Sequence, residues 1–279
     1  MIRFSDCKIN LGLYVTARRP DGYHEVETVM YPVGWYDVIE VTPTPGTAPT
    51  LNVYGRSVDC PPEKNLVFKA LHALESYIGR NLEVSVGLQK IIPDSAGLGG
   101  GSADAAFTLK ALNDLFGLGL SQDILARIAA GIGADCPFFI YDRPALCTGI
   151  GTDLCHDIDI DLSPYSILVA KPRVAAVSTR EAYAAITPCS GRIPLLEILR
   201  LPVKEWRGLL VNDFETGVFQ RLPEVGALKA RMYSAGALFS SMSGSGASVY
   251  GIFASAKMAR HAADTMTDCD IHLSVPGAE

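Results

Sequence analysis

The most constraining feature of this sequence is a glycine-rich segment, which reads PDSAGLGGGSADAA over residues 93–106. Apolar and polar side chains alternate over 82–89, which predicts a half-buried strand before it, and a helix is predicted over 103–116. Glycine permits positive φ and lets the backbone approach a ligand closely. The start of a helix adds N–H groups and a positive dipole end. The segment therefore predicts a phosphate-binding loop.

The loop differs from two common phosphate loops. It has no Gly-Lys-Ser/Thr ending, and Ser102 occupies the position of the third glycine in a GxGxxG pattern. A flexible turn without a ligand is the alternative. Four glycines just before a helix favour the phosphate-binding interpretation over that alternative.

Length and composition restrict the class of protein. The chain has 279 residues, which favours two domains, and we expect them to span 1–158 and 159–279. Apolar residues make up 48% and charged residues 19%, which excludes a disordered chain. The net charge of −6 argues against nucleic-acid and membrane partners. Seven scattered cysteines without a CxxC pair argue against disulfides and structural zinc and favour a cytoplasmic location.

The remaining segments mix strands and helices without a βαβ rhythm, which predicts an α+β fold. Strands are expected over 26–33, 36–41, 166–171 and 247–253, the last of these as the final strand. Helices are expected after the caps Asn65, Ser121, Ser178 and Ser255, and after Pro223. The helix after Ser121 is expected to carry a stripe of isoleucines at 124, 128 and 132.

The glycine loop resembles the second motif of the GHMP kinases, which in that family wraps the phosphates of ATP. Residues 241–247, SMSGSGA, resemble the family's C-terminal glycine motif, and residues 8–13, KINLGL, resemble its first motif. The resemblance implies a two-domain α+β kinase, with a nucleotide-binding N-terminal domain and an active site in the interdomain cleft.

The resemblance also implies a set of residues that hold ATP. Mg²⁺ would be held mainly by the nucleotide, without a dedicated protein metal site. The predicted ATP-binding residues are Pro93, Ala96, Gly97, Leu98, Gly99, Gly100, Gly101, Ser102, Ala103, Ser243 and Gly244.

Two residues are predicted to be catalytic. Asp135 follows an apolar helix, and the resemblance makes it the base that takes the proton of the acceptor hydroxyl. Lys8 would keep that carboxylate ionised and stabilise the developing alkoxide. The alternatives are a carboxylate that braces a turn and a solvated lysine at the start of a strand.

Within the family, residues 18–25, RRPDGYHE, and 133–139, GADCPFF, are similar to kinases whose substrate is a cytidine diphosphate-linked polyol. The resemblance implies that Tyr23 and His24 bind the pyrimidine, that Tyr183 stacks on it, and that Asn10 orients the substrate. Another small-molecule GHMP kinase of the homoserine or mevalonate type, or a non-catalytic nucleotide-binding relative, remains an alternative. The oligomeric state is left open.

One departure from the family pattern concerns the start of the glycine loop. Asp94 and Ser95 stand where the resembling kinases carry small or apolar residues. An Asp94 carboxylate within reach of a triphosphate would be repulsive. We therefore expect this side chain to point away from the phosphates or to contact another part of the nucleotide.

Overall fold

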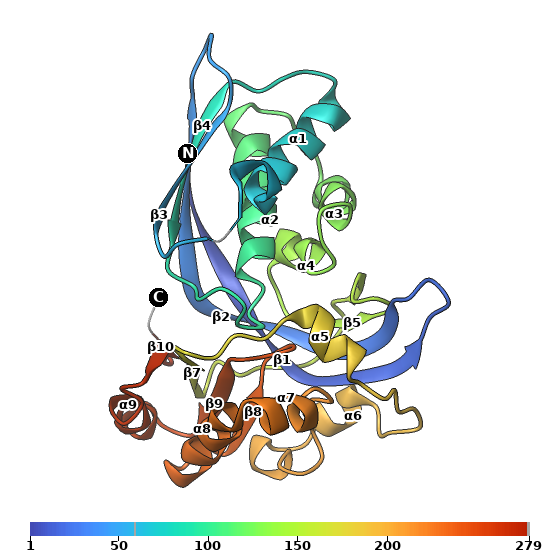
Figure 1. Ribbon diagram of the computed structural model, residues 1–279, viewed down its shortest axis with the longest axis vertical. Coiled ribbons are helices and arrows are strands. Elements are labelled where there is room, and N and C mark those ends of the chain that lie inside the picture. Colours follow the sequence, from blue (N-terminus) through green and yellow to red (C-terminus); the bar gives the residue numbers. More distant parts are fainter. Residues whose placement is uncertain (59, 278–279) are drawn as a thin grey trace. The chain divides into compact units, whose positions relative to one another are not determined.

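The computed structural model describes residues 1–58 and 60–277 (Figure 1). The chain packs into two compact units, each assembled from several segments. The first unit contains residues 1–7, 34–94 and 99–143, and the second contains 8–33, 95–98 and the chain from 144 onward. The two longest strands, β1 (Ile2–Arg18) and β2 (His24–Pro43), contribute residues to both units. The predicted division after residue 158 stays a prediction.

The first unit is a layer of helices on a sheet. Strand β4 (Val84–Lys90) pairs in parallel with β3 (Thr50–Gly55) and antiparallel with the second half of β2. Its helices lie on one side of these strands (Figure 1). They are α1 (Leu66–Ile78), α2 (Gly100–Leu115), α3 (Gln122–Ala130) and α4 (Cys136–Tyr141), preceded by the short 3-10 helix Pro62–Lys64.

The second unit contains an antiparallel sheet with the order β10-β7-β9-β8. These strands are β7 (Ser166–Pro172), β8 (Phe239–Met242), β9 (Val249–Phe253) and β10 (Cys269–Ser274). The first half of β2 pairs with β5 (Ala145–Thr148), which pairs with β6 (Asp153–Cys155). The helices are α5 (Thr179–Ala184), α6 (Leu195–Leu199), α7 (Glu215–Arg221), α8 (Pro223–Ser234), α9 (Ala256–Asp264) and the 3-10 helix Val203–Glu205.

Helix α8 contacts β7, β8 and β9 of this sheet, and α9 contacts β7, β9 and β10. Apolar side chains from the two helices and the strands form one buried cluster, which includes Val225, Leu228, Val249 and Ala259. Among the described residues, every helix is too short or too polar to cross a membrane.

The predicted helix caps are confirmed. The side chains of Asn65, Ser121, Ser178 and Ser255 each accept a hydrogen bond from a backbone N–H in the first turn of the following helix. Pro223 occupies the first turn of α8. These local signals lie within four residues of the groups they satisfy, which is why the sequence alone carries them.

Four local predictions were wrong in detail. Helix α3 ends at Ala130, so Ile132 lies beyond it, and the three isoleucines of the expected stripe are half-buried. The buried residues of α3 are Leu125, Ala126 and Ala129. Helix α2 begins at Gly100, three residues before the predicted start. The two predicted strands over 26–41 are one strand, β2, which continues through Gly34 at a φ of 71°. Strand β10 follows the strand that was expected to be the last.

Candidate active site

Three consecutive carbonyl groups of the glycine loop accept hydrogen bonds from within the second unit. The carbonyl of Leu98 accepts from the N–H of Lys8 at 3.0 Å, and that of Ala96 from the N–H of Ser248 at 3.1 Å. The carbonyl of Gly97 accepts from Ser243 Oγ at 2.9 Å. Because C=O and N–H point in opposite directions across a trans peptide, the N–H groups of residues 97–99 face away from these partners. That orientation suits an anion on the opposite side.

Lys8 and Asn10 extend this arrangement from β1. The buried ammonium of Lys8 donates to Asn10 Oδ1 at 2.6 Å and to the carbonyl of Gly97 at 3.0 Å. The amide of Asn10 donates in turn to Thr28 Oγ1 at 2.9 Å. The structure therefore joins the predicted catalytic lysine to Gly97 directly and the predicted substrate-orienting asparagine to Gly97 through that lysine.

The two glycine motifs touch at Gly97 and Gly244. A Cβ on Gly97 would lie 2.0 Å from the carbonyl oxygen of Ser243, and one on Gly244 would lie 2.9 Å from that of Gly97. Both residues have positive φ, 73° and 54°. Glycine is required at these positions by the close approach of two backbones as well as by the conformation.

The second motif is supported by residues that the sequence analysis did not single out. Asn212 donates to the carbonyls of Met242 and Gly244, at 2.8 Å each. Glu215 accepts from the N–H of Met242 at 2.9 Å and from Ser241 Oγ at 3.0 Å. These contacts join residues about 30 positions apart in the chain. Local spacing and helix or strand propensity therefore give no indication of them.

In the first unit, the start of α2 lies beside the segment that carries Asp135. Gly99, which has no side chain to cap the helix, takes a φ of 73° before the first turn. Ser102 of this turn forms a hydrogen bond with the thiol of Cys136, the residue after Asp135. Burial raises the pKa of the Cys136 thiol to about 12, although the Ser102 hydrogen bond opposes the shift, so the thiol stays protonated. Ser102 and Asp135 are thus linked through a single residue.

A buried charged network fixes both sides of the glycine loop within the first unit. Lys90 forms ion pairs with Asp37 and, at 2.8 Å, with Asp104 of α2. Asp37 also accepts the N–H groups of Ile91 and Ile92, the two residues that lead into the loop. Burial raises the pKa of Asp104 to about 6, partly offset by the charge of Lys90. The network ties the end of β4 to the first helical turns after the loop.

Several predicted ATP-binding residues offer only their backbone. The side chains of Pro93, Ala96, Leu98 and Ala103 are buried, and the N–H of Ala103 donates to the carbonyl of Gly99. Asp94 and Ser95 are exposed. The roles of all these residues stay predictions.

Two of the three aromatic side chains predicted to bind substrate meet in the second unit. The rings of His24 and Tyr183 lie 5.1 Å apart at 32°, and Tyr183 packs edge-on against Phe214 at 4.8 Å. Tyr23 is 61% exposed, in a turn where its N–H donates to Asp21. Burial, together with the charge of Arg18, lowers the pKa of His24, which keeps its ring neutral near pH 7. A neutral imidazole both donates and accepts hydrogen bonds, as recognition of a base edge requires.

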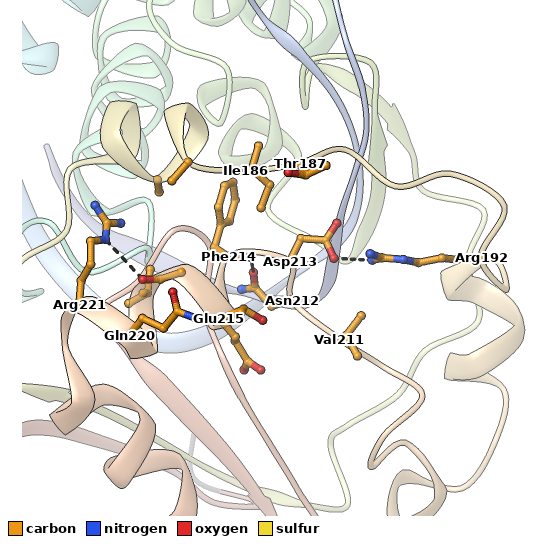
Figure 2. Close-up of a pocket in the computed structure, with 15 residues that line it drawn as sticks. Ile186, Thr187, Arg192, Val211, Asn212, Asp213, Phe214, Glu215, Gln220 and Arg221 are labelled. Carbon is orange, nitrogen blue, oxygen red and sulfur yellow. Dashed lines mark hydrogen bonds and ion pairs between the residues drawn. The ribbon is translucent and has the colours of Figure 1, made fainter.

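Next to this aromatic group lies a cavity of about 530 Å³ (Figure 2). Its lining includes α5, the segment 211–214 and α7. Asp213 lies on its wall and is paired with Arg192, and Phe214 extends toward Ile186. Asp213 also accepts the N–H of Val15 at 2.8 Å, so the cavity wall is tied to β1.

Comparisons with known proteins agree with this geometry. The family model for the N-terminal domain of GHMP kinases matches residues 65–143, and the model for the C-terminal domain matches residues 199–269. The first match contains the glycine loop and Asp135, and the second contains Asn212 and the second glycine motif.

Curated relatives match over nearly the whole chain. A 4-diphosphocytidyl-2-C-methyl-D-erythritol kinase from Parabacteroides distasonis is 50% identical, and the match covers 91% of this chain and 92% of the relative. An enzyme of the same name from Porphyromonas gingivalis is 42% identical, with 96% and 97% covered.

Solved structures share the fold. A crystal structure of 4-(cytidine 5'-diphospho)-2C-methyl-D-erythritol kinase matches with a TM-score of 0.78 and 32% identity, over 95% of this chain and 94% of that one. A mevalonate kinase matches with a TM-score of 0.72 at 13% identity, over 98% of each chain, which shows the fold alone. The predicted two-domain α+β fold is confirmed. The chain belongs to the GHMP kinase family and, within it, to the group of 4-diphosphocytidyl-2-C-methyl-D-erythritol kinases.

Proposed function

We propose that this protein transfers the γ-phosphoryl group of ATP to the 2-hydroxyl of 4-diphosphocytidyl-2-C-methyl-D-erythritol, a step in isoprenoid precursor synthesis by the non-mevalonate route. The observation that carries the nucleotide half of the proposal is the glycine loop. Its carbonyls at 96–98 are hydrogen-bonded within the second unit, which turns the following N–H groups away from these partners.

ATP fits the donor set of this loop. The N–H groups of residues 97–101, the Ser102 hydroxyl and the positive end of the α2 dipole are the groups that bind phosphate oxygens in proteins. Mg²⁺ bound with the nucleotide would neutralise charge on the transferred phosphoryl group. Ser243 and Gly244 complete the phosphate site from the second motif.

The reaction assigns distinct roles to Asp135 and Lys8. Asp135 accepts the proton of the acceptor hydroxyl as its oxygen attacks the γ-phosphorus. The bond between the γ-phosphorus and the bridging oxygen breaks, and ADP leaves with that electron pair. The ammonium of Lys8, already fixed by Asn10 and Gly97, stabilises negative charge on the attacking oxygen.

The acceptor site would use the aromatic group of the second unit. Tyr183 and the exposed Tyr23 offer faces for a pyrimidine ring, and the neutral His24 offers hydrogen bonds to its edge. Asn10 would orient the acceptor. We expect no nucleic-acid or membrane partner for this chemistry, and a cytoplasmic location.

A coupled assay of ADP release tests the proposal. The protein would be given ATP, Mg²⁺ and one acceptor from a panel: 4-diphosphocytidyl-2-C-methyl-D-erythritol, the same polyol phosphate without its cytidine group, homoserine and mevalonate. ADP release with the first acceptor alone is expected. Release with homoserine or mevalonate would contradict the proposed substrate, and ATP binding without transfer to any acceptor would contradict the proposed reaction.

A further inference from the structure

Asn212 is a buried amide whose every hydrogen-bonding group is used. It is 4% exposed and forms an isolated β-bridge with Leu13, just before the turn that leads into α7 (Figure 2). Its Nδ2 donates to the carbonyls of Met242 and Gly244, and its Oδ1 accepts the N–H of Phe214 at 3.0 Å. The amide therefore bridges a turn that begins one helix and a loop that lies about 30 residues further along the chain.

The two carbonyls that Asn212 holds flank Ser243. The Met242 carbonyl belongs to the peptide before Ser243, and the Gly244 carbonyl belongs to the peptide after Gly244. The Ser243–Gly244 backbone is therefore held at both of its ends, which restricts the direction of the Ser243 side chain. Ser243 Oγ then donates to the carbonyl of Gly97 at 2.9 Å, which is one of the three contacts that turn the glycine loop. The chain of contacts runs from Asn212 through the second motif to the first.

We infer that Asn212 is a positioning residue for nucleotide binding, which holds the Ser243–Gly244 backbone in the conformation that the triphosphate site requires. The inference deepens the proposed function and rests on the proposed use of ATP. Asn212 acts on the nucleotide through the second motif.

The chemistry of the site calls for a neutral amide. Two carbonyl acceptors need two N–H donors, and the Phe214 N–H needs an acceptor on the same side chain. Aspartate has the same shape but no donor, so Asn212→Asp would set a carboxylate against two carbonyl oxygens. Serine would keep a single donor.

Asn113 provides a matched control. Its side chain also bridges backbone, because its Nδ2 donates to the carbonyl of Leu120 and its Oδ1 accepts the N–H of the same residue. It lies in the first unit at the end of α2. Asn113→Asp is thus the same chemical change at an amide that does not hold a glycine motif.

The test measures binding of a non-hydrolysable ATP analogue with Mg²⁺ by calorimetry, in the absence of acceptor, for the wild type, N212D, N212S and N113D. We expect N212D to lower the affinity for the analogue at least about tenfold, because two buried carbonyl acceptors lose their donors. N212S should lower this affinity less, and N113D should bind the analogue with the affinity of the wild type. In steady-state assays, the KM for ATP should rise in N212D while the KM for the cytidine-linked acceptor stays within about twofold.

Thermal unfolding followed by circular dichroism establishes which variants are folded. A folded N212D with wild-type affinity for the analogue would overturn the inference. Equal rises in both KM values would do the same, since a general structural defect has no preference for one substrate. Failure of both N212D and N212S to fold would show that Asn212 serves the whole unit and would also overturn it. A wild type that does not bind the analogue would instead contradict the proposed function.

Discussion

The two glycine motifs are held in place by different chemistry. The flanks of the first, at residues 90–92 and 104, are fixed by Lys90 between two buried carboxylates, those of Asp37 and Asp104. The second motif is fixed by the neutral amide of Asn212 and by Glu215, which accepts two hydrogen bonds from it. The first arrangement is a cation between two buried carboxylates, whereas the second combines an amide, which does not titrate, with a carboxylate that is paired with Lys229.

The difference teaches that the same task, which is to hold a glycine-rich backbone still, has two solutions with different weaknesses. A buried ion network is costly to break because a leftover charge has no compensation. An amide bridge costs less when it is lost, but it depends on the exact arrangement of donors and acceptors. The predictions below separate these two supports from each other and from the chemical step.

The largest effect is expected outside both motifs. Asp135→Asn removes the proposed base with little change in side-chain size, so kcat should fall by about 10² to 10⁴ while ATP affinity is kept. Single-turnover ADP release and calorimetry measure the two quantities. Near-normal turnover in the folded variant would rule out Asp135 as the base.

Breaking the charged support should cost the most stability. Lys90→Met leaves the carboxylates of Asp37 and Asp104 buried without their cation, which should lower the free energy of unfolding by about 3–5 kcal/mol. Urea denaturation measures the loss. Arg231→Met, which removes an exposed pair with Asp268, is the control and should cost about 1 kcal/mol or less. Equal losses in the two variants would contradict the assigned role of the network.

The contact between the motifs is tested by adding a single methyl group. Gly97→Ala should lower the affinity for ATP more than Gly244→Ala does. The new Cβ would lie 2.0 Å from a carbonyl oxygen at residue 97 and 2.9 Å from one at residue 244. Gly117→Ala is the control: its φ is also positive, at 57°, but a Cβ there meets no described atom within 4 Å. It should cost about 1–2 kcal/mol of stability from backbone strain and leave ATP affinity unchanged. ATP affinities in the reverse order for the two motif variants would refute the contact.

The smallest effect is a pH dependence that the network of Asp37, Lys90 and Asp104 produces. The folded-state pKa of Asp104, about 6, lies above the usual value of 3.8 because the carboxyl is buried. Its contribution to stability is therefore present below pH 4 and is lost as the pH rises toward 6 and above. Asp104→Asn should flatten the unfolding free energy over that window.

A second carboxyl of the first unit provides a comparison for that measurement. Burial and the neighbouring Asp142 raise the pKa of Asp6 to about 8, so its contribution declines over a wider range, up to pH 8. Asp6→Asn should remove the decline in unfolding free energy between pH 6 and 8. Below pH 6 it should leave the decline that comes from Asp104. Urea unfolding from pH 4 to 8 tests both variants, and an unchanged profile in Asp104→Asn would contradict the assignment.

Features that depend on neighbouring residues could be predicted from the sequence, whereas contacts between residues far apart in the chain could not. Asn65 and Ser121 were found because a cap acts within one turn of its own helix. The sequence predicts a stripe of isoleucines on α3, but tertiary packing buries Leu125 and the alanines of this helix instead. Lys90 and Asn212 have no local signature, since their partners are brought to them only by the fold.

The site was predictable to the extent that its motifs are contiguous. The glycines of 97–101 predict a phosphate-binding loop by their composition. The family resemblance indicated Lys8 and Asn10, and in the structure Lys8 donates to both Asn10 and Gly97. What the sequence could not give was the direction of the peptide groups. That direction depends on the partners that the carbonyls of residues 96–98 find on β1 and around Ser243 and Ser248.

The central claim is that the outward-facing N–H groups of the glycine loop bind the triphosphate. Amide proton and nitrogen chemical shifts of residues 97–101, followed by NMR as a non-hydrolysable ATP analogue and Mg²⁺ are added, test it most directly. The account predicts that the largest shift changes occur at these amides. Saturable binding of the analogue with these amides unmoved, and the largest changes elsewhere, would contradict it.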